Sequence, residues 1–495
     1  MENPEKNNAI QGYFLLILSI SLAVFMSSLD GTIVNIALPA ITETFGITTT
    51  TVSWVATSYL LVEVGCVLIF GKMADTIGYK KIFLSGFFVF TLGSFFCGFI
   101  PEFIGGFPSL VLSRVLQAVG GAMLMAVAAA MITAYIPAEQ KGKAMSIVML
   151  CASLGTAIGP TIGGVLTQHL SWHWIFFINV PVGIIAILLG AKVIPESQPT
   201  TDPTAFDKAG AGLVFVGLAS LVFVVSEGET FGWTSPVILG VTALTIITLG
   251  WFVKRELGLF DPLLDLRLFR NRNFFLANLL LGLVFLSFSG IEYLLPFFLQ
   301  YVHNYDTSTA GLILSSLAFA MMISGIIAGA AFNRTGPRRL CIIACIPMII
   351  GYYMMTMLDV HISTAFVVVS LALIGFGLGL LVTPLTSLIM MSVSKTKAGM
   401  VSSLTSLERQ APCSIGIAIY NLLLIESVIM VAKSHAVTLQ SPKDIQLEVL
   451  SAGFDLAFTL SLVLGIIIFV IALLIKEEIH PDYEEEAKIL RHDMH

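Results

Sequence analysis

Residues 153–164 read SLGTAIGPTIGG and lie within a longer segment that otherwise has the pattern of a helix. This short stretch contains four glycines and one proline. In water, each glycine inside a helix costs about 1 kcal/mol and a proline about 3 kcal/mol relative to alanine. A water-exposed helix would not tolerate this run, so the stretch indicates that the solvent around it is not water.

The overall composition indicates that this solvent is lipid. Hydrophobic residues make up 57% of the 495 residues, and the mean hydropathy is +0.94. Charged residues make up 11%, compared with about 25% in typical soluble domains. The formal net charge of −6 gives no reason to expect a nucleic-acid partner.

Apolar stretches of about 20 residues, each long enough to cross a hydrocarbon core of ~30 Å as a helix, recur along the chain. Fourteen of them are predicted as spans: 13–38, 50–71, 82–100, 108–133, 144–168, 175–194, 209–227, 235–253, 274–300, 309–332, 340–357, 364–391, 400–431 and 453–475. The sequence therefore predicts an all-α polytopic membrane protein.

Lys and Arg residues concentrate in alternate gaps between these stretches. With a cytoplasmic N-terminus, 21 of the 25 lie in inner gaps or tails, as expected because basic residues stay on the cytoplasmic side during insertion. Residues 1–12 are polar and the first apolar stretch has full spanning length, so we expect a span and no cleaved signal peptide. We predict a multi-pass protein of the cytoplasmic membrane with both termini inside.

Two of the inner gaps resemble each other. Residues 71–81 read GKMADTIGYKK and residues 329–339 read GAAFNRTGPRR, with the same spacing of Gly, Asp or Asn, Gly and two basic residues. Internal repeats of this kind are typical of secondary transporters. If the second span corresponds to the tenth, the fourteen spans divide into six, two extra and six.

This division predicts the domain organisation. We expect an N-terminal six-helix bundle over 1–194, a linker with two extra transmembrane helices and a basic cytoplasmic segment over 195–273, a C-terminal six-helix bundle over 274–476, and a cytoplasmic tail over 477–495. Within the linker, residues 254–273 are compatible with a cytoplasmic surface helix or hinge and equally with a solvated loop.

Five motifs together resemble the major facilitator superfamily, and within it the fourteen-helix drug:proton antiporters. Residues 71–81 resemble the superfamily's cytoplasmic loop motif, RVLQAVGGA at 114–122 its fourth-helix motif, and 155–164 the motif called the antiporter motif. LDGTIVNIALP at 29–39 and WHWIFFINVPVG at 172–183 resemble signatures of the fourteen-helix branch. The resemblance implies the major facilitator fold, with two six-helix bundles and two extra central helices.

The opening stretch is a candidate hinge. Gly155, Gly159 and Gly163 recur at every fourth residue, so they lie on one helix face and allow a neighbouring backbone to approach closely. Pro160 cannot donate to the carbonyl four residues earlier, which bends the helix. With Gly164, these residues predict a gate that helps to determine which side of the membrane is open; ordinary close packing is the alternative.

The loop motif is a candidate cytoplasmic latch formed by Gly71, Asp75, Gly78 and Lys80. The resemblance implies that Asp75 accepts hydrogen bonds from the start of a neighbouring helix or from a basic loop residue, and so holds the cytoplasmic side shut. The second copy carries Asn333 at this position, so only the first copy has the charge. The alternative is a loop carboxylate in water.

Ionisable residues within spans are candidates for function, since a charge at the bilayer centre costs roughly 2.5 to 3.5 kcal/mol. At ~1.5 Å per residue, Asp30 lies about 25 Å from the inner start of its helix, and Arg114 about 9 Å from the outer start of its own. Both residues therefore lie in the outer half, where we expect an ion pair that substrate or an outward opening alters. A permanent structural pair is the alternative.

Three further acids are candidates for proton coupling or substrate binding. Glu63 lies near the middle of its span and is either a counter-charge for a cationic substrate or a neutral hydrogen-bond donor between helices. Glu292 and Glu408 are each followed by a proline four residues later, which leaves the acid's own backbone carbonyl without its helical donor. We expect both to line a cavity in the C-terminal half.

Together these observations predict a proton-coupled secondary active transporter that exports lipophilic, cationic drugs by alternating access. No Walker sequence is present, so ATP is not expected as the direct energy source. We expect no enzyme activity, no cofactor, no metal site and no nucleic-acid partner; the partners are protons, small lipophilic cations and the bilayer, and the protein is expected to be a monomer. The alternatives are a transporter of a single metabolite or lipid and, from another class, a membrane sensor on a transporter-like scaffold.

Overall fold

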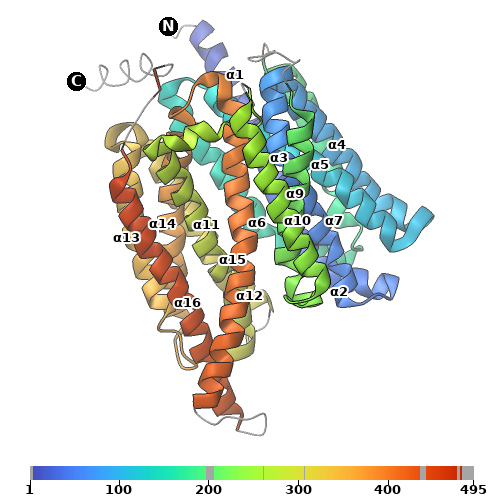
Figure 1. Ribbon diagram of the computed structural model, residues 1–495, viewed down its shortest axis with the longest axis vertical. Helices are drawn as coiled ribbons and strands as arrows, with labels where there is room; N and C mark the ends of the chain where they lie inside the picture. Colours follow the sequence, from blue (N-terminus) through green and yellow to red (C-terminus); the bar gives the residue numbers. More distant parts are fainter. Residues whose placement is uncertain are drawn as a thin grey trace. The chain divides into compact units, whose positions relative to one another are not determined.

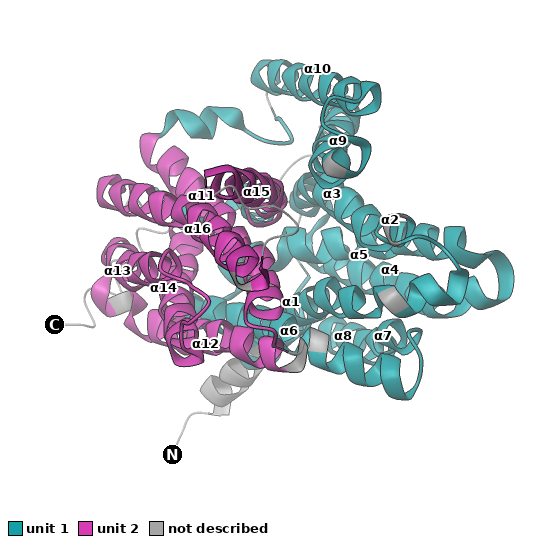
Figure 2. Ribbon diagram, turned by 90° about the horizontal axis from the view of Figure 1, so that it is seen from below, with its two compact units in different colours: residues 1–271, 389–407, 479–495 teal, residues 272–388, 408–478 magenta. Residues whose placement is uncertain are grey.

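The computed structural model describes residues 4–196, 206–259, 261–305, 307–434, 442–476 and 480–481. Within these residues all regular secondary structure is helical (Figure 1). The chain divides into two compact units (Figure 2). Unit 1 comprises Met1–Asn271, Ile389–Leu407 and Ile479–His495, and unit 2 comprises Arg272–Leu388 and Glu408–Glu478.

Unit 1 contains the first ten α-helices and the start of α15. Its elements are α1 (Pro4–Phe45), α2 (Thr49–Val52), α3 (Trp54–Ile77), α4 (Tyr79–Ile100), the π turn η1 (Pro101–Gly105), α5 (Gly106–Tyr135), α6 (Ala138–His169), α7 (Trp174–Phe177), α8 (Asn179–Val193), α9 (Lys208–Phe231), α10 (Pro236–Gly258) and the 3-10 helices η3 (Leu266–Arg270) and η5 (Lys395–Lys397).

Unit 2 contains the remaining helices. Its elements are α11 (Arg272–Phe297), the π turn η4 (Phe298–Val302), α12 (Thr307–Thr335), α13 (Pro337–Met355), most of α14 (Thr364–Met391), α15 (Ala398–Ser434) from residue 408 onward, and α16 (Lys443–Leu474).

The membrane spans agree with the sequence prediction. Among the described residues, thirteen segments are long and apolar enough to cross a membrane, and one of them, Tyr79–Tyr135, contains both α4 and α5. Counting these two helices separately gives the fourteen predicted spans (13 + 1 = 14). The chain is a multi-pass membrane protein.

The helices extend beyond the apolar stretches, and this is where the predicted boundaries differ. For example, α16 begins at Lys443, ten residues before the predicted start at 453. Hydrophobicity marks the part of a helix that lies in hydrocarbon, whereas the helix itself continues as long as its backbone hydrogen bonds do.

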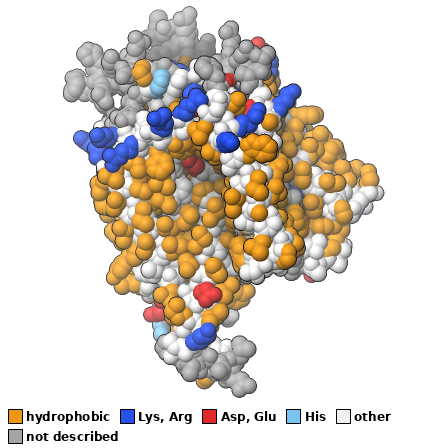
Figure 3. Space-filling view, viewed as in Figure 1, with side chains coloured by type: hydrophobic (Ala, Val, Ile, Leu, Met, Phe, Trp, Pro, Cys, Tyr) orange, Lys and Arg blue, Asp and Glu red, His pale blue; other side chains and the backbone are white. Residues whose placement is uncertain are grey.

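Large apolar side chains on the helix flanks are exposed, as a lipid environment requires. Ile246 on α10 is 68% exposed and Leu312 on α12 is 73% exposed. Figure 3 shows hydrophobic side chains spread over the helix flanks, while Lys and Arg side chains gather near helix ends. This arrangement places charge where headgroups and water can solvate it.

The extra helices α9 and α10 pack against each other, and α9 packs on α3 within unit 1 (Figures 1 and 2). A Cβ atom added at Gly65 of α3 would lie 2.8 Å from the Phe215 ring of α9, so this glycine allows the close approach. The extra pair is thereby joined to unit 1.

The glycines of the opening stretch lie against α1, as their spacing predicts. A Cβ atom at Gly155 would lie 2.6 Å from the backbone oxygen of Phe25, and one at Gly163 would lie 2.9 Å from the oxygen of Ile33. Gly159 faces Thr32 between them. Close packing of α6 on α1 therefore accounts for these three glycines.

Gly164 does not belong to this contact, because a Cβ there would make only an ordinary contact of 3.8 Å with Ile36. The helix α6 continues through residue 160, whose side chain lies outside the described part of the chain. The gating role of these residues stays a proposal.

The described residues between α10 and α11 contain no α-helix. After α10 ends at Gly258, the described residues form an irregular stretch followed by the 3-10 helix η3. Most of the predicted linker at 195–203 and almost all of the tail at 477–495 lie outside the described residues.

Candidate functional site

An ion pair buried in unit 1 joins α1 to α5. Arg114 Nη1 lies 2.7 Å from Asp30 Oδ2, and these two residues are 1% and 0% exposed. The pair predicted from equal depth in the membrane is therefore present. Two buried ions lose their hydration, so such a pair is stable only when further hydrogen bonds satisfy its remaining polar atoms.

Two amide side chains supply these hydrogen bonds. Gln117 Nε2 donates to Asp30 Oδ1 at 2.8 Å, and Asn179 Nδ2 donates to the same oxygen at 3.1 Å. Gln117 Nε2 also lies 2.8 Å from Ser94 Oγ. Both carboxylate oxygens of Asp30 therefore accept hydrogen bonds, from α5 and α8.

Arg114 is held from several sides as well. Its Nη1 donates to Gln117 Oε1 at 2.6 Å, and its Nε donates to the backbone oxygen of Val55 at 3.1 Å. The guanidinium carbon lies 4.3 Å from the centroid of the Tyr59 ring, a cation–π contact. We call Asp30, Ser94, Arg114, Gln117 and Asn179 the outer polar cluster.

Local sequence explains how the helices bring this cluster together. A Cβ at Gly120 of α5 would lie 2.8 Å from the backbone oxygen of Gly86, and one at Gly93 of α4 would lie 2.6 Å from the backbone nitrogen of Gln117. These glycines therefore let α4 and α5 touch along the face that carries Gln117. Asn179 begins α8, where Pro181 is tolerated because first-turn N–H groups have no helical partner.

Glu63 lies deep in the same unit but outside the outer polar cluster. It is 4% exposed, and a Cβ at Gly121 of α5 would lie 3.6 Å from its Oε1 atom. The carboxyl therefore faces the α3–α5 interface, in agreement with its predicted position near the middle of a span.

A further buried acid, Glu227 on the extra helix α9, was not singled out from the sequence. It is 2% exposed, and its Oε1 atom accepts a hydrogen bond from Thr57 Oγ1 at 3.4 Å. It is the last residue of the predicted span 209–227. Phe223 and Glu227 are four residues apart and therefore share one helix face. This spacing is a sequence signal that Glu227 lies on the same side of α9 as an apolar side chain.

The residues of the predicted latch make a defined contact within unit 1. Asp75 is 2% exposed, and it accepts hydrogen bonds from the backbone N–H groups of Gly399 at 2.9 Å and Met400 at 3.0 Å. These N–H groups open α15 and have no intrahelical partner, and the positive end of the helix dipole favours the carboxylate there. The predicted contact with the start of a neighbouring helix is therefore present.

The other latch residues support this contact. Tyr79 donates its hydroxyl to Asp75 Oδ1 at 2.9 Å. A Cβ at Gly71 would lie 2.6 Å from the backbone oxygen of Gly399, so this glycine permits α3 and α15 to meet. Gly78 has φ +100°, which suits glycine, and it ends α3 before Lys80 in the first turn of α4.

Two of the predicted acids, Glu292 on α11 and Glu408 on α15, lie in unit 2. Glu292 is exposed, and its Oε2 atom lies 3.7 Å from Cys413 Sγ, the residue after Pro412. Glu408 Oε2 is buried and has no hydrogen-bond partner among the described residues. The helix α11 ends at Phe297, one residue after Pro296, and the π turn η4 follows, so the hydrogen bonding changes after Glu292.

Comparison with known proteins agrees with this fold and these motifs. Residues 20–417 match the family model of the Major Facilitator Superfamily, and the chain belongs to this superfamily. It is a secondary transporter, not an enzyme.

Several characterised relatives have transport names. The multidrug transporter protein MdtP of Bacillus subtilis is 33% identical over 404 residues, covering 81% of this chain and 74% of MdtP. The riboflavin transporter RibZ of Clostridioides difficile is 32% identical over 417 residues, covering 84% of this chain and 89% of RibZ. The crystal structure of the human organic anion transporter MFSD10 has the same fold, with a TM-score of 0.66 at 14% identity, covering 92% of this chain and 99% of that chain.

Proposed function

We propose that this transporter exports lipophilic, cationic drugs in exchange for protons, by alternating access, with both termini in the cytoplasm. The proton gradient would supply the energy, at ~2.3 kcal/mol per charge for each 100 mV of membrane potential. The relatives named as multidrug transporters support the class of substrate.

The observation that carries the proposal is the outer polar cluster. Both oxygens of Asp30 are occupied by donors from Arg114, Gln117 and Asn179. In the proposal, withdrawal of one of these donors accompanies proton binding to Asp30, and this couples protonation to movement of α5 or α8 relative to α1. In the proposal Asp30 binds the proton, Arg114 tunes it, and Glu63, Glu292 and Glu408 act as secondary acids for protons or cationic substrate.

The gate residues supply the alternating access. Asp75 holds the start of α15 when the cytoplasmic side is shut. The helix α6, which carries Gly155, Gly159, Pro160 and Gly163, packs closely on α1, which carries Asp30. This close contact lets the two helices move as a unit. Loading of Asp30 would be transmitted to α6 through this contact.

The test is a substrate panel in proteoliposomes. Protein is reconstituted with an imposed pH gradient, and uptake of ethidium, tetraphenylphosphonium, a neutral dye and riboflavin is measured with and without an uncoupler. The proposal expects gradient-dependent uptake of the two cations. Equal uptake of both cations after the uncoupler would overturn it.

A transporter for one metabolite is the second candidate, and similarity to a riboflavin transporter favours it. That candidate expects transport of riboflavin alone among the panel. The buried and exposed acids of unit 2 favour cations instead, since riboflavin carries no positive charge for Glu292 or Glu408 to attract.

A further inference from the structure

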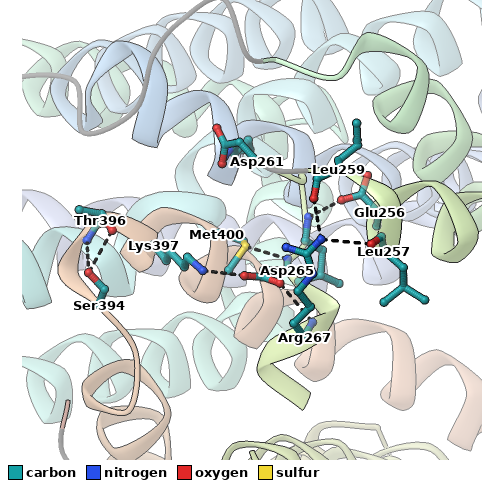
Figure 4. A network of polar contacts seen from close by, with 12 residues as sticks. Glu256, Leu257, Leu259, Asp261, Asp265, Arg267, Ser394, Thr396, Lys397 and Met400 are labelled. Carbon is teal, nitrogen blue, oxygen red and sulfur yellow. Dashed lines mark hydrogen bonds and ion pairs between the residues drawn. The ribbon is translucent and has the colours of Figure 1, made fainter. Parts of the chain in front are cut away.

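The segment between α10 and α11 makes specific polar contacts at both ends of the cytoplasmic latch. Residues 261–271, which we call the strap, run from just after α10 to the start of α11, and all their polar contacts described here lie within unit 1. Figure 4 shows the network around Asp265, with Lys397 and Met400 on one side and Glu256 and Arg267 on the other.

The first anchor joins the strap to α3. Lys72 Nζ forms an ion pair and hydrogen bond with Asp261 Oδ1, and the Lys72 side chain is 5% exposed. Lys72 lies one residue after Gly71 and three before Asp75, in the same turn of the helix as the latch. The anchor therefore holds the part of α3 that carries the latch carboxylate.

The second anchor joins the strap to the start of α15. Lys397 Nζ lies 2.6 Å from Asp265 Oδ2, and the backbone N–H of Asp265 lies 3.2 Å from Met400 Sδ. Lys397 ends η5 directly before α15, and Met400 also donates its own N–H to Asp75. This anchor therefore holds Met400, one of the two residues whose N–H groups contact Asp75, together with Lys397, which lies two residues before the other, Gly399.

Between the two anchors the strap has a defined shape. Glu256 Oε2 accepts the N–H of Leu264 at 3.0 Å, and Arg267 Nη2 donates to the backbone oxygens of Leu257 and Leu259 at 3.1 and 2.9 Å. Asp265 Oδ1 accepts the N–H of Arg267 at 3.1 Å. The end of α10 thus fixes how far apart Asp261 and Asp265 lie.

We infer that the strap is a positioning element for the latch. The pairs Lys72–Asp261 and Lys397–Asp265 set the register of α3 against the start of α15, so that Asp75 meets the N–H groups of Gly399 and Met400. The inference rests on the latch role given to Asp75 under the proposed function. It gives the extra helices a role, since α10 carries the strap.

Charge and exposure set the expected size of the effect. The Lys397 and Asp265 side chains are 41% and 13% exposed. Partly exposed ion pairs contribute little individually, so breaking one should raise the open population of the latch by roughly 2- to 5-fold and breaking both by about 10-fold.

The test measures opening directly. Ser403 is fully buried under the latch, and it is changed to cysteine in a chain whose six native cysteines are replaced. The rate at which a maleimide labels this thiol reports opening of the α3–α15 contact. The single variants Asp265→Lys and Lys397→Asp are compared with the double variant that exchanges the two charges.

The inference expects roughly 2- to 5-fold faster labelling in each single variant. Labelling in the double variant should be slower than in Asp265→Lys, because the ion pair is restored although the Asp265–Arg267 hydrogen bond is not. Arg255→Ala is the matched control, because it breaks the Asp207–Arg255 pair at the end of α10 without touching the latch or strap residues. This control should label at the original rate.

Asp75→Asn separates this inference from the proposed function. Fast labelling in Asp75→Asn together with unchanged labelling in both single strap variants would overturn the strap and leave the latch standing. Unchanged labelling in Asp75→Asn would overturn the latch and with it the strap. Labelling in the charge-exchanged double variant that is as fast as in Asp265→Lys would also overturn the strap, because a restored ion pair should recover part of the register.

Discussion

The contact between α1 and α6 allows a prediction worked from its geometry. In Gly155→Ala the added Cβ would lie 2.6 Å from the oxygen of Phe25, 3.0 Å from the nitrogen of Leu29 and 3.1 Å from Ser28 Cβ. Two of these atoms are backbone and the third is fixed to it, so no rotamer change relieves the clash. The helices must separate by several tenths of an ångström.

Overpacking of this kind costs about 1 to 3 kcal/mol. The gain in helix propensity from Gly to Ala, about 1 kcal/mol, offsets part of that cost. We therefore expect Gly155→Ala to lower the thermal unfolding temperature in detergent and to slow gradient-driven ethidium uptake.

Gly164→Ala is the matched control on the same helix. Its Cβ would make only an ordinary contact of 3.8 Å with Ile36, so this variant should keep or slightly raise the unfolding temperature. Equal unfolding temperatures for the two variants would refute the reasoning, because the close approach of α1 would then have no energetic consequence.

Two further predictions concern the extra helices. Thr57→Val removes the hydroxyl that donates to the buried acid Glu227 and should destabilise the protein by about 1 kcal/mol. Glu227→Gln keeps an accepting oxygen, so it should lower the unfolding temperature less than Thr57→Val does. A larger loss in Glu227→Gln than in Thr57→Val would contradict the assigned hydrogen bond. The Arg255 side chain is hydrogen-bonded to Asp207 and lowers the pKa of that carboxyl. The stability gained from the pair is therefore fully present above pH ~4, the ordinary pKa of an aspartate, and is lost as the pH falls through the lowered pKa of Asp207. Arg255→Ala should therefore unfold at a lower temperature than the original chain at pH 6, and this difference should shrink as the pH falls through the lowered pKa of Asp207. A difference that does not shrink on acidification would argue against the pair as its source.

The spans and the close approach of some neighbouring helix to Gly155, Gly159 and Gly163 could be predicted from local sequence, whereas the identity of that helix, α1, comes from the structure. A helix needs about 20 apolar residues to cross hydrocarbon, and glycines at every fourth residue share one face whatever the rest of the fold does. The pairing of Asp30 with Arg114 followed from depth alone, since two opposite charges at the same level of a bilayer have few other partners.

The partners of these charges could not be predicted in the same way. Gln117 and Asn179 are neutral, so no charge or hydropathy signal distinguishes them from other polar residues in spans. The pairs Lys72–Asp261 and Lys397–Asp265 join residues 189 and 132 positions apart, and only the folded arrangement of α3, α10 and α15 makes them neighbours. The same applies to Glu227, whose burial depends on the packing of α9 on α3.

The central claim is that protonation of Asp30 is coupled to substrate movement, and substrate-driven proton release tests it most directly. Purified protein in liposomes is given ethidium, and released protons are recorded with a pH-sensitive dye for the original chain, for Asp30→Asn and for Glu43→Gln, an exposed acid on the same helix. We predict proton release in the original chain and in Glu43→Gln and none in Asp30→Asn. Undiminished release in Asp30→Asn would contradict the account.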